Sequence, residues 1–135
     1  MIDSVVLEEM LIPNHNITVK TTPTTNPNDT ESTKAVKLDF YDDDKKIGIA
    51  YISAIDTNNG FIYNLEVYKK YRGNGYANDI MNYILKNYKA RSLSVLKTNT
   101  IAINLYKKFG FKVTQSYKWG KQDLYYMELK YNKKR

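Results

Sequence analysis

The sequence predicts an α/β protein of the α+β type, with strands and helices combined in one domain over residues 1–135. The chain is long enough for this, because 135 residues with 42% hydrophobic side chains suffice for one ordinary core. Residues 35–41 alternate apolar and polar side chains, as a strand does, and further short apolar segments follow. Two later segments repeat apolar residues at helical spacing, and the first follows a glycine-rich turn at residues 71–77.

The first part of the chain has the least decisive pattern. Residues 4–12 suit either a short helix capped by Ser4 or a strand across residues 5–7. Residues 17–20 suit a short strand. Residues 21–33 are mostly threonine, proline, asparagine and aspartate without a hydrophobic period, and this composition predicts a loop.

A hairpin and a further strand are expected next. Residues 35–41 and 47–55 form its two strands, and residues 61–67 form the strand that follows. The acidic segment 42–46 lacks the later glutamate and the spacing of a calcium loop. We therefore expect it to be a solvated turn.

Two helices are expected in the second half of the chain. The first spans residues 76–88, and the second spans residues 100–109 after a cap at Asn99 or Thr100. Gly110 is well placed to end the second helix, since glycine adopts the left-handed conformation there at little cost. The apolar stripe of the first helix consists of Ala77, Ile80, Met81, Ile84, Leu85 and Tyr88.

Three more strands complete the expected order of elements. They lie at residues 92–96, 111–117 and 124–131. Residues 119–121 are expected to form the hairpin turn between the last two. Residues 132–135 form a basic tail, where chain ends are commonly frayed.

The composition limits the classes of function. A net charge of +7 favours anionic partners, but no nucleic-acid-binding motif accompanies it, so nucleic acid is a weak expectation. The absence of cysteine excludes disulfides, thiolate zinc sites and a cysteine nucleophile, and agrees with a cytoplasmic protein. The single histidine, His15, falls in an expected turn and is predicted to be solvated. No apolar run is long enough to cross a membrane, and the first residues lack a signal-peptide pattern, so no membrane partner is expected.

The glycine-rich turn at residues 71–77 has the sequence YRGNGYA. Unpaired N–H groups at the start of the following helix, its dipole and the cation of Arg72 would together suit a phosphate. A P-loop is excluded because Tyr76 and Ala77 follow the second glycine, and a Rossmann fingerprint is excluded because Asn78 replaces its third glycine. On these residues alone, an anion site and a tight turn without a ligand are about equally well supported.

A second group of residues lies on the helix expected at 100–109. Helical geometry brings together, within roughly 100° of arc, the side chains of Asn99, Ala102, Ile103 and Tyr106. The side expected to face the core consists of Ile101, Ala102, Leu105 and Phe109. Tyr106 lies at the edge of that side, so it is either a packed core-edge tyrosine or one whose hydroxyl faces a cleft.

Taken together, the two segments resemble the GCN5-related N-acetyltransferase (GNAT) family. The matching residues are Leu65, Glu66 and Val67 at a strand end, Arg72, Gly75 and Ala77 in the turn, and Asn99, Ala102, Tyr106, Gly110 and Phe111 around the second helix. This match covers residues 61–111. The first sixty residues match poorly beyond the hairpin, and the two helices that usually follow the family's first strand are not evident.

The resemblance implies a mixed central sheet of about six to seven strands, splayed open between the strands at 61–67 and 92–96. Acetyl-CoA would lie in this opening as the co-substrate, with no metal. Its pyrophosphate would rest on backbone N–H groups of the turn, and its pantetheine arm would pair with the strand end. The implied cofactor-binding residues are Leu65, Val67, Arg72, Gly73, Asn74, Gly75, Tyr76, Ala77, Asn99 and Tyr106.

The resemblance also implies roles in the reaction. Tyr106 would act as the general acid that protonates the leaving thiolate. Glu66 is the only carboxylate in the strand at 61–67, so it is either the general base or an exposed or ion-paired side chain. Ser94 stands where some relatives carry a glutamate, so that base is missing here.

The expected function is therefore an N-acetyltransferase that moves an acetyl group from acetyl-CoA to a primary amine by direct attack in a ternary complex. The alternative is a non-catalytic acyl-CoA-binding or protein-interaction module on the same fold. The amine acceptor can be a small molecule or a protein, and the chain can be a monomer or a homodimer.

Overall fold

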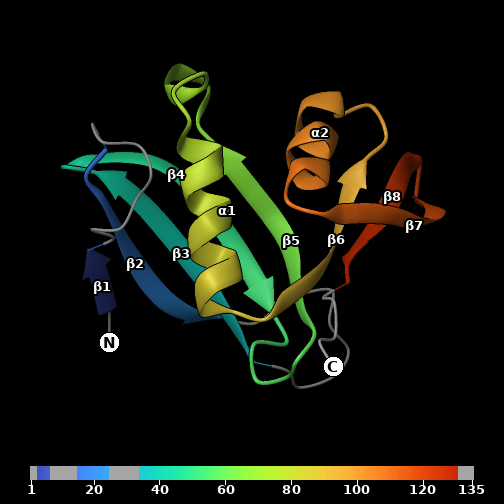
Figure 1. Ribbon diagram of the computed structural model, residues 1–135, viewed down its shortest axis with the longest axis horizontal. Coiled ribbons are helices and arrows are strands. Elements are labelled where there is room, and N and C mark those ends of the chain that lie inside the picture. The colour runs from blue at the N-terminus through green and yellow to red at the C-terminus, as the bar shows by residue number, and fades with distance from the viewer. Residues whose placement is uncertain (1–2, 7–14, 25–33, 131–135) are drawn as a thin grey trace, which may run out of the picture.

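The computed structural model describes residues 3–6, 15–24 and 34–130, which form one eight-stranded sheet with helices against it (Figure 1). The strand order is β1-β2-β3-β4-β5-β6-β8-β7. The elements are β1 (Asp3–Val6), β2 (Ile17–Thr24), β3 (Ala35–Asp42), β4 (Lys45–Ser53), β5 (Gly60–Val67), the short 3₁₀ helix η1 (Lys69–Tyr71), α1 (Tyr76–Asn87), β6 (Ala90–Leu96), α2 (Thr100–Lys108), β7 (Phe111–Trp119) and β8 (Gln122–Leu129).

The sheet is mixed, as expected. Strands β1 to β5 are antiparallel neighbours, β5 and β6 are parallel, and β6, β8 and β7 are again antiparallel. The count exceeds the predicted six to seven because Asp3–Val6 pairs with β2 as an additional strand. Of the two alternatives for residues 4–12, the structure therefore has a strand at its start, and residues 7–14 lie outside the described part of the chain.

The predicted loop at 21–33 is wrong in its first part. Residues 21–24 continue β2 and pair with the start of β3. Threonine is β-branched and suits a strand despite its polarity, which is why composition alone misassigned this segment. Pro23 is tolerated because β1 pairs with β2 only as far as Thr21, so among the described residues nothing pairs with β2 there from that side. Residues 25–33 lie outside the described part.

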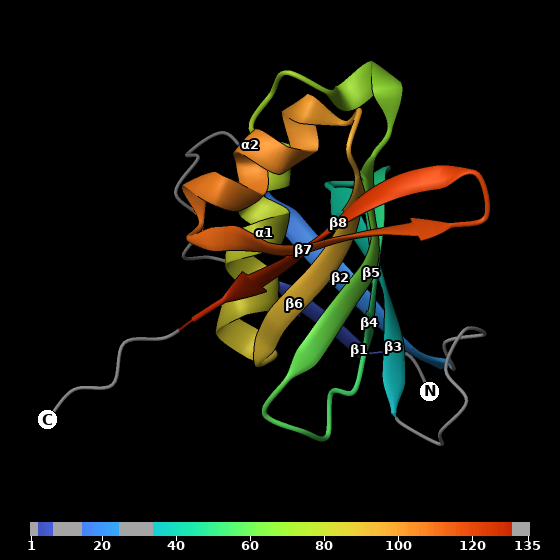
Figure 2. The same cartoon turned by 90° about the vertical axis from the view of Figure 1, so that its right-hand side faces the viewer.

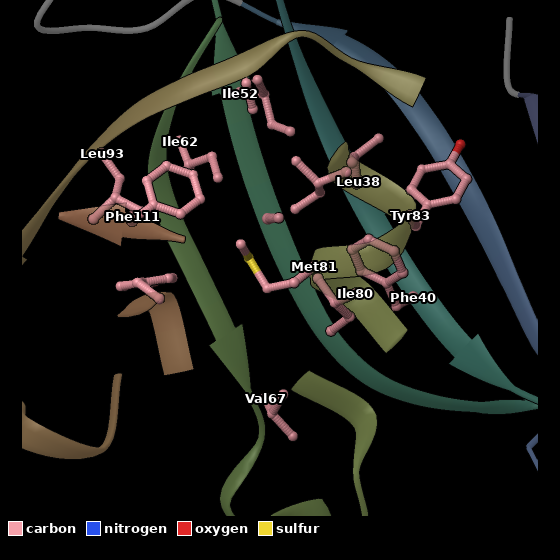
Figure 3. Packing of buried hydrophobic residues seen from close by; sticks show 14 of the residues in the cluster. Leu38, Phe40, Ile52, Ile62, Val67, Ile80, Met81, Tyr83, Leu93 and Phe111 are labelled. Atoms are coloured by element: carbon pink, nitrogen blue, oxygen red, sulfur yellow. The ribbon is translucent and has the colours of Figure 1, made fainter. Parts of the chain in front are cut away.

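Both helices lie over the same face of the sheet, as Figure 2 shows. The predicted stripe of α1 is confirmed, since Ile80, Met81 and Ile84 are fully buried against the sheet. Figure 3 shows Ile80 and Met81 among apolar residues from the strands, including Leu38 and Phe40. This packing fixes α1, and with it the glycine-rich turn from which α1 begins.

Replacing Phe40 with alanine should destabilise the fold strongly. Phe40 is fully buried, and its ring meets the edge of Tyr83 from α1 at a centroid distance of 5.8 Å. The lost contacts and the remaining cavity should lower the free energy of unfolding by about 3–5 kcal/mol, as urea denaturation would measure. As a control, Trp119→Ala at a side chain that is 62% exposed should change it by only about 0.5 kcal/mol.

Candidate active site

The sheet opens between β5 and β6. These parallel strands pair only at Gly60, Phe61 and Ile62, and from there on they separate. The predicted splay between the two strands is thus confirmed. Next to the separated strand ends lies a cavity of about 670 Å³. It is lined by Asn64, Leu65, Glu66, Val67, Tyr71, Arg72, Gly73, Gly75, Tyr76, Ala77, Asn78, Asn99, Ile101, Ala102, Leu105 and Tyr106.

The glycine-rich turn forms one wall of this cavity. Gly73 and Gly75 both have φ of +84°, a conformation that glycine adopts without strain. Gly75 is also the N-cap of α1 and carries no side chain that could occupy the first N–H groups of the helix. These groups are therefore available to an anion, which the helix dipole also favours.

Two side chains of the turn stabilise its conformation through hydrogen bonds to backbone carbonyls. Arg72 Nε donates to the carbonyl of Val67 at 2.8 Å, which ties the turn to the end of β5. Asn74 Nδ2 donates to the carbonyl of Tyr71 at 3.0 Å. Arg72 lines the cavity, and of the six turn residues predicted to bind the cofactor only Asn74 is outside the lining.

Tyr106 projects from α2 into the opposite wall. Its side chain is 6% exposed and its ring meets Phe111 at 6.2 Å. Tyr106 is packed in the core and also lines the cavity. Burial raises the pKa of the Tyr106 hydroxyl to about 12, so it stays protonated at neutral pH and can donate a proton.

Of the two predicted caps of α2, Asn99 or Thr100, the structure has Asn99. Its Oδ1 accepts a hydrogen bond from the N–H of Ala102 at 3.1 Å, and the residue also lines the cavity. The expected core side of this helix was wrong at Ile101, which is 85% exposed, whereas Ile103 is buried together with Tyr106. Ile101 lies in the first turn of α2 and lines the cavity, which leaves its side chain open to solvent.

The end of β5 contributes both faces of its strand to the cavity. Val67 is buried and Leu65 is partly buried against the core, whereas Glu66 between them is exposed. All three line the cavity. Ser94 on β6 bonds to the hydroxyl of Tyr117 at 2.6 Å and does not belong to this lining.

The structure corrects the expectation that His15 is solvated. Its side chain is only 9% exposed, its Nδ1 lies 2.6 Å from Asp79 Oδ2, and its ring stacks on Tyr76 at 4.1 Å. The acidic turn is also less solvated than expected, because the Tyr76 hydroxyl donates to Asp42 Oδ2. Neither pair has a local sequence signal, since 64 and 34 residues separate the partners.

Burial and these contacts shift the protonation equilibria of the cluster. Burial raises the pKa of Asp79, while the hydrogen bond with His15 acts in the opposite direction. Burial, followed by the bond to Asp42, raises the pKa of Tyr76 to about 12. The Tyr76 hydroxyl is therefore a stable donor to Asp42 at neutral pH.

Two further findings concern the described residues only. None of their helices is long and apolar enough to cross a membrane. In residues 3–6, 15–24 and 34–130, no group of three or more histidine, cysteine or acidic side chains is placed to hold a metal ion.

An enzyme that transfers an acyl group from CoA must hold an anionic cofactor, and the start of α1 beside this cavity suits an anion. The fold and the cavity thus define an acyl-CoA-dependent N-acyltransferase. More narrowly, the chain belongs to the acetyltransferase (GNAT) family, whose sequence profile matches residues 8–111, and acetyl-CoA is its co-substrate. A comparison with curated proteins finds no match.

Solved structures share this fold. Naa50 of Arabidopsis thaliana, in complex with the bisubstrate analogue CoA-Ac-MVNAL, is 25% identical, with 70% of this chain and 72% of that chain covered and a TM-score of 0.61. A GNAT family acetyltransferase from Elizabethkingia anophelis with acetyl-CoA bound is 16% identical, with 84% and 98% covered and a TM-score of 0.62. The ribosomal-protein-S18-alanine N-acetyltransferase from Escherichia coli is 16% identical, with 96% and 93% covered and a TM-score of 0.63.

Proposed function

We propose that this chain binds acetyl-CoA in the cavity between β5 and β6 and transfers its acetyl group to a primary amine in a ternary complex. The observation that carries the proposal is that one cavity joins the glycine turn, the separated end of β5 and Tyr106. The pyrophosphate would accept hydrogen bonds from the N–H groups of residues 72–77. The pantetheine arm would pair with β5 beyond Ile62, where no described strand occupies the side that faces β6.

The proposed reaction is direct attack of a neutral amine on the thioester carbonyl. The new bond forms between the amine nitrogen and the acetyl carbon, and the bond between that carbon and the CoA sulfur breaks. The Tyr106 hydroxyl is protonated when the reaction begins, and it donates its proton or a hydrogen bond to the departing thiolate. The extra proton on the acetylated nitrogen leaves to a base or to water.

An amine must lose a proton before it can attack. A lysine-type amine with a pKa of about 10.4 is neutral in only about one molecule in 2,500 at pH 7, so a proton acceptor accelerates the reaction. Glu66 is our candidate, because it is a carboxylate that lines the cavity on the strand next to the opening. Its exposure means that water competes for the same role.

Replacing Glu66 with glutamine should lower kcat/KM for the amine about tenfold at pH 7, because amide oxygen is a far weaker base than carboxylate. The loss should shrink at higher pH, where more of the amine is already neutral. A steady-state pH profile measures both effects. Glu128→Gln serves as the control, since Glu128 lies on β8 outside the cavity lining. If Glu66→Gln kept full activity at every pH, the proton acceptor would be water.

The acceptor panel should begin with peptides that carry a free N-terminus, because Naa50 was solved with an analogue in which CoA is joined to MVNAL. Lysine-containing peptides and small amines complete it. Mass spectrometry after incubation with acetyl-CoA would detect an acetylated product with the expected mass. Binding of acetyl-CoA without any product across the panel would favour the non-catalytic module instead.

A further inference from the structure

A partly buried polar cluster lies directly behind the start of α1. It consists of His15 before β2, Asp79 and Tyr76 on α1, and Asp42 at the end of β3. His15 contacts Asp79 at 2.6 Å and stacks on Tyr76 at 4.1 Å, and the Tyr76 hydroxyl donates to Asp42. The proposed reaction uses none of these side chains, although Tyr76 itself lines the cavity.

The carboxylate of Asp79 stands in the first turn of α1, the helix whose N-terminus faces the cavity. Its side chain is 1% exposed, and among the described residues its Oδ1 has no hydrogen-bond partner. A buried negative charge so close to the helix terminus would repel a phosphate through the protein interior, where water screens little. In the described structure His15 is the group that bonds to this carboxylate, through Oδ2.

The same histidine also has a geometric effect on the turn. Its ring packs against Tyr76, the first residue of α1, whose N–H group is part of the proposed anion site. Asp42, the partner of the Tyr76 hydroxyl, is in turn held by the N–H of Asn16 at 3.0 Å. The start of β2 and the end of β3 thus fix the helix terminus from behind.

We propose that His15 is a positioning residue for acetyl-CoA: it compensates the buried carboxylate of Asp79 and holds Tyr76, so that the start of α1 accepts the pyrophosphate. This inference rests on the proposed pyrophosphate site. His15 does not line the cavity and would act through its contacts with Asp79 and Tyr76 on α1.

The test compares two acetyl donors. Acetyl-CoA carries the pyrophosphate, whereas S-acetylpantetheine has the same thioester and arm but lacks the pyrophosphate and the phosphorylated adenosine joined to it. His15→Gln should raise KM for acetyl-CoA about tenfold, because the buried carboxylate of Asp79 loses its hydrogen-bond partner and Tyr76 loses the ring on which it stacks. It should change kcat, and KM for S-acetylpantetheine, less than about twofold, because neither depends on the anion site.

A second variant provides a rescue. In His15→Gln/Asp79→Asn the buried charge is gone and two amides can bond, so KM for acetyl-CoA should return to within about threefold of the wild-type value. Asp79→Asn alone should leave that KM unchanged or lower it. Lys20→Gln is the control. Val19 points into the core, so its neighbour Lys20 lies on the face of β2 that points away from the core. Removing this cation should leave KM for acetyl-CoA unchanged.

Four results would overturn the proposal. An equal loss with both donors, or no rescue in the double variant, would mean that His15 only supports the fold. Thermal melting of each variant would then show a matching loss of stability. If wild-type protein prefers acetyl-CoA and His15→Gln keeps that preference, the His15 proposal fails while the pyrophosphate site stands. If wild-type protein uses both donors equally well, the pyrophosphate site itself is wrong, and the role of His15 fails with it.

Discussion

Tyr106→Phe should lower kcat about 100-fold or more while KM for acetyl-CoA changes less than about twofold. The substitution removes one oxygen and keeps the ring, so the contact with Phe111 and the packing of α2 persist. What disappears is the proton donor for the departing thiolate. An interaction that matters only as the carbon–sulfur bond breaks affects turnover and spares cofactor binding.

The control for this variant is Tyr83→Phe. Tyr83 is about as buried as Tyr106, at 4% against 6% exposure, and it lies on α1 outside the cavity. It should retain near wild-type turnover, as steady-state kinetics with a fixed acceptor would show. Unchanged turnover in Tyr106→Phe would exclude Tyr106 as the acid and leave the thiolate to be protonated by water.

The pKa of Tyr106 adds a condition on the pH profile of the wild-type enzyme. Because burial raises this pKa from its ordinary value of 10 to about 12, the hydroxyl is lost as a donor only when the pH approaches 12. A decline in kcat that begins between pH 8 and 10 would therefore belong to another group. The proton donor is available throughout the range in which amines become neutral.

The parts of the structure that the sequence predicts well have local causes. The apolar stripe of α1, the cap at Asn99 and the turn at residues 71–77 each depend on residues within one or two helical turns. The splay between β5 and β6 came from the family resemblance, because alternation identifies strands but not where two of them separate. The roles of Tyr106 and Glu66 remain predictions, since position beside a cavity does not establish chemistry.

The predictions that proved wrong concern features that depend on residues far apart in the sequence. His15 was expected in solvent because its neighbours form a turn, yet its partner Asp79 comes 64 residues later. Residues 21–24 were expected in a loop because of their composition, yet pairing with β3 makes them a strand. Ile101 was expected in the core because of its helical spacing, yet it lines the cavity and its side chain is open to solvent. In all three cases the environment of the residue is set by tertiary structure and not by its neighbours in the sequence.

Gly73→Val should raise the Kd for acetyl-CoA about 100-fold and also reduce stability. At φ of +84° a β-branched residue is strained by about 1–2 kcal/mol, so the turn should shift to relieve it. A displacement of about 1 Å at a site that positions a ligand can cost about 100-fold. The side chain would also stand where the cofactor approaches the backbone, since Gly73 lines the cavity. Isothermal titration calorimetry with acetyl-CoA measures the effect.

Gly120→Val separates strain from the loss of the anion site. Gly120, in the turn between β7 and β8, also has positive φ, and a Cβ added at either glycine meets no atom within 4 Å. The two variants should therefore lose similar stability in thermal melts, but only Gly73→Val should lose acetyl-CoA affinity. Comparable affinity in both would mean that the cofactor does not approach the turn. A loss confined to Gly73→Val, and absent with S-acetylpantetheine, would place the pyrophosphate at the start of α1.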